Sequence, residues 1–444
     1  MKLKLRMLLM LALAPLASGA QDVPRNCDLE FPNRPQTRLT IVTAPDGNQN
    51  AFSGGGVVAR CIGQNNLLTA DSAEYYESQG LLLLIGNVHY TEPRVKVDAQ
   101  TMTYYQADDH LHAEGSVVAV LDNGTTMRGP NADYYRSVPN RPVSRLFASG
   151  RPQLDLVQRD TSGRNRPPQT ARLLANQITM QGDSIVYAGG QVVLTRPDLV
   201  AKGDSAFLDG ENDFARLMKS PQIEGKGERA FTLDGGIIDL YSRDRQLERV
   251  VATPNGHILS QDLELVADSI DLRLKTNQLE RAMAWGAKRA RALSPEREIV
   301  ADSIDVIMPG QKVREVRALR GAYATSQPDS GIVTEERDWI RGDTIVARFD
   351  TVATGDSTSR PRVREIVAEG KAQSYYQLKN SRGPSTLPTV NYVRGRIITI
   401  DFADRRVTTV TVVDEAVGMF VEPAPAPATA APVPAPVRRP PAND

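Results

Sequence analysis

Apolar and polar positions alternate with a period of two along most of the chain. The clearest copies are "LVADSIDLRL" (265–274) and "IVADSIDVIM" (299–308), in which apolar residues lie two apart with a polar residue between them. This period is typical of a β-strand with one apolar face, not of a helix. Because nearly the same ten residues occur twice, they indicate a structural repeat, whereas a catalytic motif is normally needed once.

Related segments flank these two copies and bring the total to about ten units. Each begins with small or polar residues and continues with alternating apolar positions. They span residues 69–76, 97–105, 128–135, 174–180, 201–208, 234–241, 341–349 and 394–402. A second strand follows in most units and ends near a glycine. These glycines are Gly86, Gly115, Gly190, Gly286, Gly321 and Gly370. A glycine inside a strand usually marks a bulge, a bend or a close approach, so we predict the same bend in each unit.

A stack of such units predicts an all-β protein with one apolar interior. The alternative from another class is an exported β-solenoid with a structural or adhesive role. A parallel solenoid needs nearly constant rungs, whereas the units here are irregularly spaced and contain two strands each. The pattern therefore favours antiparallel sheets. From sequence alone, the inward aliphatic residues could line an open groove or fill a closed core.

The ends of the chain differ from the repeats. Residues 1–20 are typical of a secretory signal peptide: Lys2, Lys4 and Arg6 precede a short apolar run, and small residues end at Ala20. This predicts an exported protein. We expect an N-terminal segment over 21–68, the repeat domain over 69–421, with a subdivision near 158–170 left open, and an extended Pro/Ala-rich tail over 422–444.

Charge and cysteine content narrow the possible functions. The chain has 53 basic and 53 acidic residues; without the three basic residues of the signal segment, 50 basic and 53 acidic residues give −3. Such a balance does not indicate nucleic-acid binding, which needs clustered positive charge. In an oxidising compartment, we predict that Cys27 and Cys61 form a disulfide.

Candidate catalytic and metal-binding residues are few. His110 and His112 share a strand face, but no cysteine or third histidine is near them, so we expect solvated histidines and no metal. Asp271 and Asp305 repeat with the units, and we expect them to face water and not to act in catalysis. We therefore expect no catalytic residues and no cofactor. Tyrosines recur in pairs, with one ring inside and one outside each strand: Tyr75 with Tyr76, Tyr104 with Tyr105, and Tyr134 with Tyr135.

The units "ADSAEYY…GNVHY", "AQTMTYY…AEGSVVAV" and "ADSIDLRL…AWGAK" resemble the LptA/OstA family of lipopolysaccharide-transport proteins. That family has an A-[DN]-x-φ-x-φ strand (φ, an apolar residue), a turn and an A-x-G-x-V strand, repeated after a signal peptide. The resemblance covers about 69–421. It implies an elongated, open β-jelly roll whose two facing antiparallel sheets form a V-shaped groove for acyl chains. This chain is longer than a simple bridge protein and lacks the long barrel of the outer-membrane member.

The resemblance also implies a lipid site, partners and a location. It implies that lipopolysaccharide or a related lipid binds in the groove. It implies that other bridge proteins bind by adding strands at the sheet edges, and an outer-membrane assembly partner is a further candidate. The location that it implies is the periplasm, with an association with the outer membrane as a further possibility. The expected groove residues are Met102, Tyr104, Ile178, Met180, Ile270, Leu272, Leu274, Ile304, Val306, Ile345, Phe349, Ile398, Ile400 and Phe402.

Overall fold

The computed structural model describes residues 27–32, 35–158, 169–226, 230–261, 263–294, 297–328, 331–332, 334–350, 361–379, 387–403 and 406–423. The predicted signal peptide, most of the central insert and nearly all of the tail lie outside these residues. The chain divides into two compact units, residues 1–119 with 131–145 and residues 120–130 with 146–444. No helix in the described part is long and apolar enough to cross a membrane.

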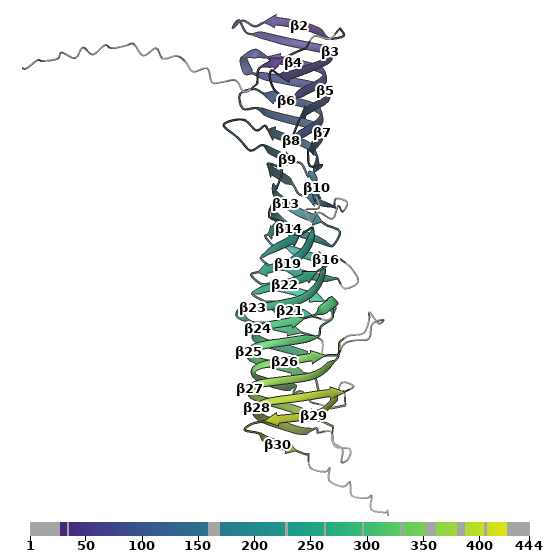
Figure 1. The fold of residues 1–444 in the computed structure, drawn as a ribbon, viewed down its shortest axis with the longest axis vertical. Coiled ribbons are helices and arrows are strands. Elements are labelled where there is room, and N and C mark those ends of the chain that lie inside the picture. Colours follow the sequence, from purple (N-terminus) through teal and green to yellow (C-terminus); the bar gives the residue numbers. More distant parts are fainter. Residues whose placement is uncertain are drawn as a thin grey trace, which may run out of the picture. The chain divides into compact units, whose positions relative to one another are not determined.

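The first unit consists of antiparallel strands and one short 3₁₀ helix, η1 (Glu77–Gln79), drawn in purple and blue in Figure 1. Its strands are β1 (Leu29–Glu30), β2 (Arg38–Thr43), β3 (Gln49–Cys61), β4 (Leu67–Tyr76), β5 (Leu81–Glu92) and β6 (Val95–Tyr105). Two further strands, β7 (His110–Leu121) and β8 (Thr126–Tyr135), contribute residues to both units. The all-β fold class predicted by the alternation is confirmed.

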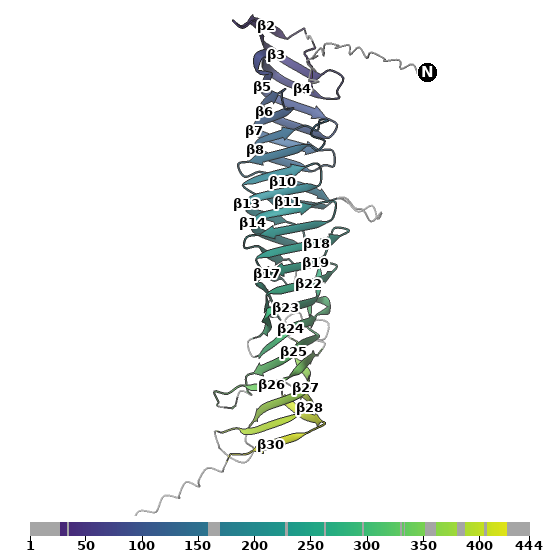
Figure 2. The same ribbon diagram turned by 90° about the vertical axis from the view of Figure 1, so that its left-hand side faces the viewer.

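The second unit continues with stacked antiparallel strands, seen from the side in Figure 2, and one 3₁₀ helix, η2 (Pro309–Gln311). Its first strands are β9 (Arg145–Ser149), β10 (Gln153–Gln158), β11 (Gln169–Leu174), β12 (Gln177–Gln181), β13 (Ile185–Thr195), β14 (Leu199–Asp209), β15 (Phe214–Met218), β16 (Gln222–Gly225), β17 (Phe231–Asp234), β18 (Ile237–Arg243) and β19 (Gln246–Thr253). The remaining strands are β20 (Gly256–Ser260), β21 (Glu264–Ala267), β22 (Ser269–Lys275), β23 (Gln278–Leu293), β24 (Arg297–Ile307), β25 (Glu315–Ser326), β26 (Asp338–Phe349), β27 (Val363–Leu378), β28 (Thr389–Ala403), β29 (Arg406–Val413) and β30 (Val417–Val421).

Two facing sheets are clearest where a long strand pairs with a different short strand along each of its halves, whereas neighbouring long strands such as β24 and β25 pair along both halves across a register shift. The first half of β14 pairs with β16 and its second half with β15. One ladder then runs β15–β18–β19–β22 and the other β16–β17–β20–β21, and both join again at β23. These pairings are antiparallel. This supports the jelly roll and removes the basis for a parallel solenoid.

The bend between the two halves of a long strand lies at the repeated glycines. Gly86, Gly115, Gly190 and Gly370 have φ between 76° and 80°, a region that side-chain-bearing residues rarely adopt. The pairing register shifts beside them, for example between Ile85 and Val88 of β5. A β-bulge of this kind lets one strand leave the first sheet and enter the second.

In five of the repeats, a polar residue at the start of the motif lies against the glycine of the following strand. A Cβ added at Gly86 would come within 2.4 Å of Asp71 Oδ2, and one at Gly370 within 2.3 Å of Asp343 Oδ2. The same relationship joins Gln100 to Gly115, Asn176 to Gly190 and Asp268 to Gly286. Close packing at the bend therefore accounts for the aspartate of the first "ADSID" copy, Asp268, whereas the glycine that follows the second copy, Gly321, meets only Arg289 Nη2 at 3.5 Å.

The outward aspartates of these motifs were predicted to face water, and this prediction is wrong. Asp271 and Asp305 do lie on the side opposite the apolar residues, but both are buried. Arginines of neighbouring strands cover them: Arg249 Nη2 lies 2.7 Å from Asp271 Oδ2, and Arg281 Nη2 lies 2.7 Å from Asp305 Oδ2. Paired charge and the arginine stems exclude the solvent that alternation alone would predict.

Cys27 and Cys61, which were paired in the sequence analysis, form a disulfide that fixes the segment before β1 to the end of β3. A buried polar network lies nearby. Arg136 Nη1 donates to Asp109 Oδ1, which also accepts from the Tyr104 hydroxyl at 2.7 Å. Burial, followed by the hydrogen bond to Asp109, raises the pKa of Tyr104. These contacts order the interior of the first unit.

Candidate functional site

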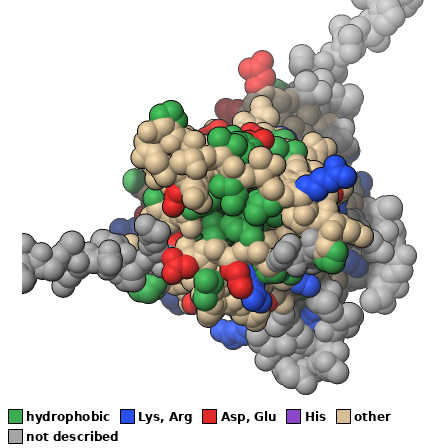
Figure 3. All heavy atoms as spheres, turned by 90° about the horizontal axis from the view of Figure 1, so that it is seen from above, with side chains coloured by type: hydrophobic (Ala, Val, Ile, Leu, Met, Phe, Trp, Pro, Cys, Tyr) green, Lys and Arg blue, Asp and Glu red, His purple; other side chains and the backbone are tan. Residues whose placement is uncertain are grey.

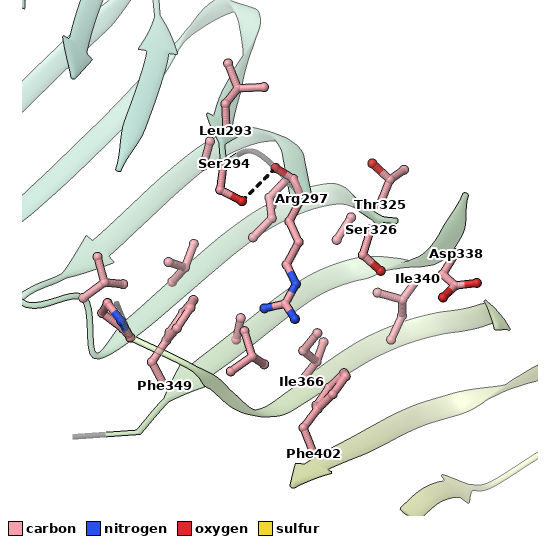
Figure 4. A pocket seen from close by; sticks show the side chains of 18 of the residues that line it. Leu293, Ser294, Arg297, Thr325, Ser326, Asp338, Ile340, Phe349, Ile366 and Phe402 are labelled. Atoms are coloured by element: carbon pink, nitrogen blue, oxygen red, sulfur yellow. Dashed lines mark hydrogen bonds between the residues drawn. The ribbon is translucent and has the colours of Figure 1, made fainter. Parts of the chain in front are cut away.

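A cavity of about 690 Å³ opens between the two sheets of the second unit, among strands β20 to β29. It lies where the interior contains small residues and rings that do not fill the space. Ala324, Ala347 and Ile366 line it together with Phe349 and Phe402. The close-up in Figure 4 shows the last three of these side chains pointing toward a common space. Its volume is within the range of about 300–1,000 Å³ that is typical of ligand sites.

The expected groove residues divide into two sets. Phe349, Ile400 and Phe402 line the cavity, and both phenylalanines are only partly buried. The other members do not line it and lie in packed interior, each with less than a tenth of its surface exposed. They are Met102, Tyr104, Ile178, Met180, Ile270, Leu272, Leu274, Ile304, Val306, Ile345 and Ile398.

The packed region and the cavity differ in their side chains. Between β14 and β23, Leu217, Ile238 and Ile270 on one ladder and Ile223 and Ile258 on the other are fully buried. Large aliphatic side chains from both sheets therefore fill the space there. Close packing of this kind leaves no room for a ligand. Accessible apolar surface lines the cavity described above, among β20 to β29, where large side chains from the two sheets do not meet in this way.

Arg297, at the start of β24, brings a positive charge to the cavity. Its guanidinium carbon lies 6.0 Å from the centre of the Phe402 ring, within reach of a cation–π contact. Figure 4 shows the side chain extending into the cavity, above Ile366 and Phe402. Its backbone oxygen accepts hydrogen bonds from the Ser294 amide and hydroxyl, which hold the turn between β23 and β24. The cavity therefore combines apolar walls with a cation.

Asp338, at the start of β26, places a carboxyl group in the same wall. It is 4% exposed and accepts a 3.0 Å hydrogen bond from the Gln377 amide. Burial is the largest influence on the pKa of Asp338 and raises it. The hydrogen bonds from Gln377 lower the pKa by less, so the net pKa is about 6. Burial, and then the hydrogen bond to Glu336, raises the pKa of Tyr375 to about 12. Tyr375 is therefore neutral at physiological pH, whereas Asp338 titrates near it.

Three residues of the cavity were not among the site residues expected from the sequence: Arg297, Asp338 and Ile366. The alternation contained a signal for all three: Asp338 lies two residues before the inward Ile340, Ile366 two before the inward Ala368, and Arg297 two before Ile299, which also lines the cavity. Period two could place these residues on the inward face, but it could not show that the interior is open at this point.

Comparisons with known proteins add little to this geometry. No protein-family model matches the chain, and no curated protein matches it. Among solved structures, it is similar to LptH, the LptA homologous periplasmic component of the conserved lipopolysaccharide transport device from Pseudomonas aeruginosa. The two share 13% identity over 43% of this chain and 82% of LptH, with a TM-score of 0.13. A match at this TM-score carries no weight for function.

Proposed function

We propose that this chain is a non-catalytic, periplasmic lipid-binding protein that shields the acyl chains of lipopolysaccharide during transport to the outer membrane. The observation that carries the proposal is the cavity between the two sheets, whose walls are largely aliphatic and aromatic. The repeated motif, which resembles that of the LptA/OstA family, and the predicted signal peptide support it further.

An apolar cavity matches the physical problem of moving such a lipid. Each methylene that leaves water contributes about 0.8 kcal/mol, so exposing a chain of about a dozen carbons costs on the order of 10 kcal/mol. A protein that covers the chain removes most of this cost without any chemical step. Phe349, Ile366 and Phe402 offer a surface that fits this role because they are apolar and not fully covered by the protein.

Arg297 favours a lipid with an anionic head group. A guanidinium beside an apolar cavity can bind a phosphate oxygen while the acyl chains occupy the space below it. Lipopolysaccharide carries both phosphates and several acyl chains. A neutral lipid would use the walls of the cavity but not this charge.

Partner binding by strand addition is supported by the terminal strands. In the described residues, β2 pairs with β3 alone and β30 with β28 alone, so each has one unpaired edge. Leu39 and Ile41 on β2, and Met419 and Phe420 on β30, are more than half exposed. Seen from above, the end that carries β2 shows hydrophobic side chains gathered at its centre (Figure 3). Exposed apolar edges of this kind suit another bridge protein or an outer-membrane assembly partner.

Site-specific photo-crosslinking in cells tests the proposal. A photoreactive amino acid at Ile366 or Phe402 is expected to give an adduct with lipopolysaccharide. Val367 is the matched control because it is also partly exposed but lies on the opposite face of the same strand. Adducts of equal yield at Ile366 and Val367, or none at Ile366 and Phe402, would contradict the proposal.

A further inference from the structure

Two histidines and one aspartate of the first unit direct their metal-binding atoms toward one point. His110 and His112 lie two residues apart on β7 and so share a face. Asp133 comes from β8, and its Oδ1 lies 2.8 Å from His110 Nε2 and 2.7 Å from His112 Nδ1. All three candidate ligand atoms lie within 4.8 Å of one another. No metal was expected from the sequence because no cysteine or third histidine lies near this pair, but the fold brings Asp133 to that position.

The other ring nitrogen of His112 also has a partner. His112 Nε2 lies 3.3 Å from Glu114 Oε1. A metal-bound histidine usually gives its second ring N–H to a carboxylate, which fixes both the tautomer and the orientation of the ring. With Nε2–H donated to Glu114, the free lone pair of His112 is on Nδ1, the atom that faces Asp133.

The site is oriented by its surroundings and still open to solvent. The His110 ring stacks on Tyr135 at 4.2 Å and on Tyr105 at 5.2 Å, so the outer tyrosines of two pairs hold it in place. The side chains of His110, Asp133 and His112 are 14%, 23% and 32% exposed.

We propose that His110, His112 and Asp133 bind a divalent transition-metal ion of the zinc class. Two imidazole nitrogens and one carboxylate oxygen would be the protein ligands, and solvent would complete the coordination. Imidazole favours zinc, copper and nickel, whereas magnesium and calcium prefer oxygen ligands alone. Three protein ligands with one open position are typical of accessible zinc sites. The proposal does not depend on lipid binding.

Calorimetric titration of the EDTA-treated full chain with ZnCl₂ tests this site. We expect one equivalent to bind and MgCl₂ to give no comparable heat. His110→Ala, His112→Ala and Asp133→Asn are each expected to weaken zinc binding at least tenfold. His89→Ala is the matched control, because His89 contacts Asp98 at 2.6 Å and belongs to no three-residue ligand group in the described chain. This control should bind zinc like the parent.

Absorption spectra of the cobalt-substituted parent chain give a readout that does not depend on any variant folding. Two nitrogens and one oxygen around Co²⁺ should produce visible bands that zinc abolishes on addition. Absence of zinc binding by the parent would overturn the proposal. It would also be overturned if the three variants bound zinc as well as the parent, or if His89→Ala lost as much affinity as they did.

Discussion

The side chain of Asp343 packs directly against Gly370 where the paired strands β26 and β27 bend: a Cβ at Gly370 would lie 2.3 Å from Asp343 Oδ2. The contact explains two features of the repeat together. The strand that opens a unit carries a small polar residue, and the next strand carries a glycine with positive φ. A side chain cannot be added at Gly370 without moving Asp343, because atoms in a close-packed bend cannot approach below their contact distance.

The first prediction is that Gly370→Ala destabilises the second unit by about 2–5 kcal/mol, since positive φ costs about 1–2 kcal/mol and overpacking adds about 1–3 kcal/mol. The matched control is Gly310→Ala. Gly310 also has positive φ, 60°, but a Cβ there would meet nothing within 4 Å. Gly310→Ala should therefore lower the stability only through backbone strain, by about 1 kcal/mol. Urea denaturation measures both, and equal losses would show that the contact with Asp343 is unimportant.

The second prediction concerns Asp271, which accepts hydrogen bonds from Arg249 at 2.7 Å and Arg273 at 3.1 Å. Removing the carboxylate leaves two arginines side by side without their shared counter-charge. Because both arginines are partly exposed, we expect Asp271→Ala to cost about 1–3 kcal/mol, and not the larger loss of a fully buried pair.

Asp204→Ala is the control for Asp271, since Asp204 contacts the exposed Lys219 at 3.1 Å and is itself about half exposed. Its loss should stay within about 0.5 kcal/mol. Thermal unfolding of both variants checks the difference. If Asp271→Ala lowers the stability no more than Asp204→Ala does, then solvation of the two arginines compensates fully for the lost carboxylate.

The alternation was sufficient to predict the all-β fold, the recurring bend and the inward side of each strand. These features depend on local period and on glycine, both of which are visible in the sequence. It could not place Asp271 under Arg249 or Asp133 beside His110, because those contacts join different strands and depend on register. It also could not distinguish filled interior from cavity. Ile270 and Ile366 occupy equivalent positions in the alternating pattern, but large side chains of the opposite sheet pack against Ile270 and not against Ile366.

The third prediction follows from burial of Asp338, whose folded-state pKa of about 6 lies above its ordinary value of 3.8. The folded state therefore holds this proton more tightly than the unfolded state does. Stability from this group is highest below about pH 4, falls as the pH rises toward 6 and is constant above that. The total loss is about 2–3 kcal/mol, at about 1.4 kcal/mol per pKa unit.

Asp338→Asn should remove this dependence, because the amide oxygen can still accept from the Gln377 amide but cannot ionise. Urea midpoints of parent and variant, compared between pH 4 and 7.5, provide the measurement. The two curves should separate as the pH rises, with the variant the more stable above pH 6. Parallel curves would mean that Asp338 is better solvated than its burial indicates.

The fourth prediction tests whether Arg297 contacts the head group of a bound lipid. Arg297→Gln should weaken binding of lipopolysaccharide about five- to tenfold, which corresponds to about 1–1.4 kcal/mol for one charge-assisted contact near solvent. Binding of a neutral diacylglycerol should not change, because its contacts are with Ile366 and Phe402. Arg394→Gln is the control, since Arg394 is exposed on β28 and does not line the cavity. Displacement of a fluorescent fatty-acyl probe measures the lipid affinity of the parent and of both variants. If Arg297→Gln weakens the binding of both lipids equally, Arg297 shapes the cavity and does not recognise the charge of the head group.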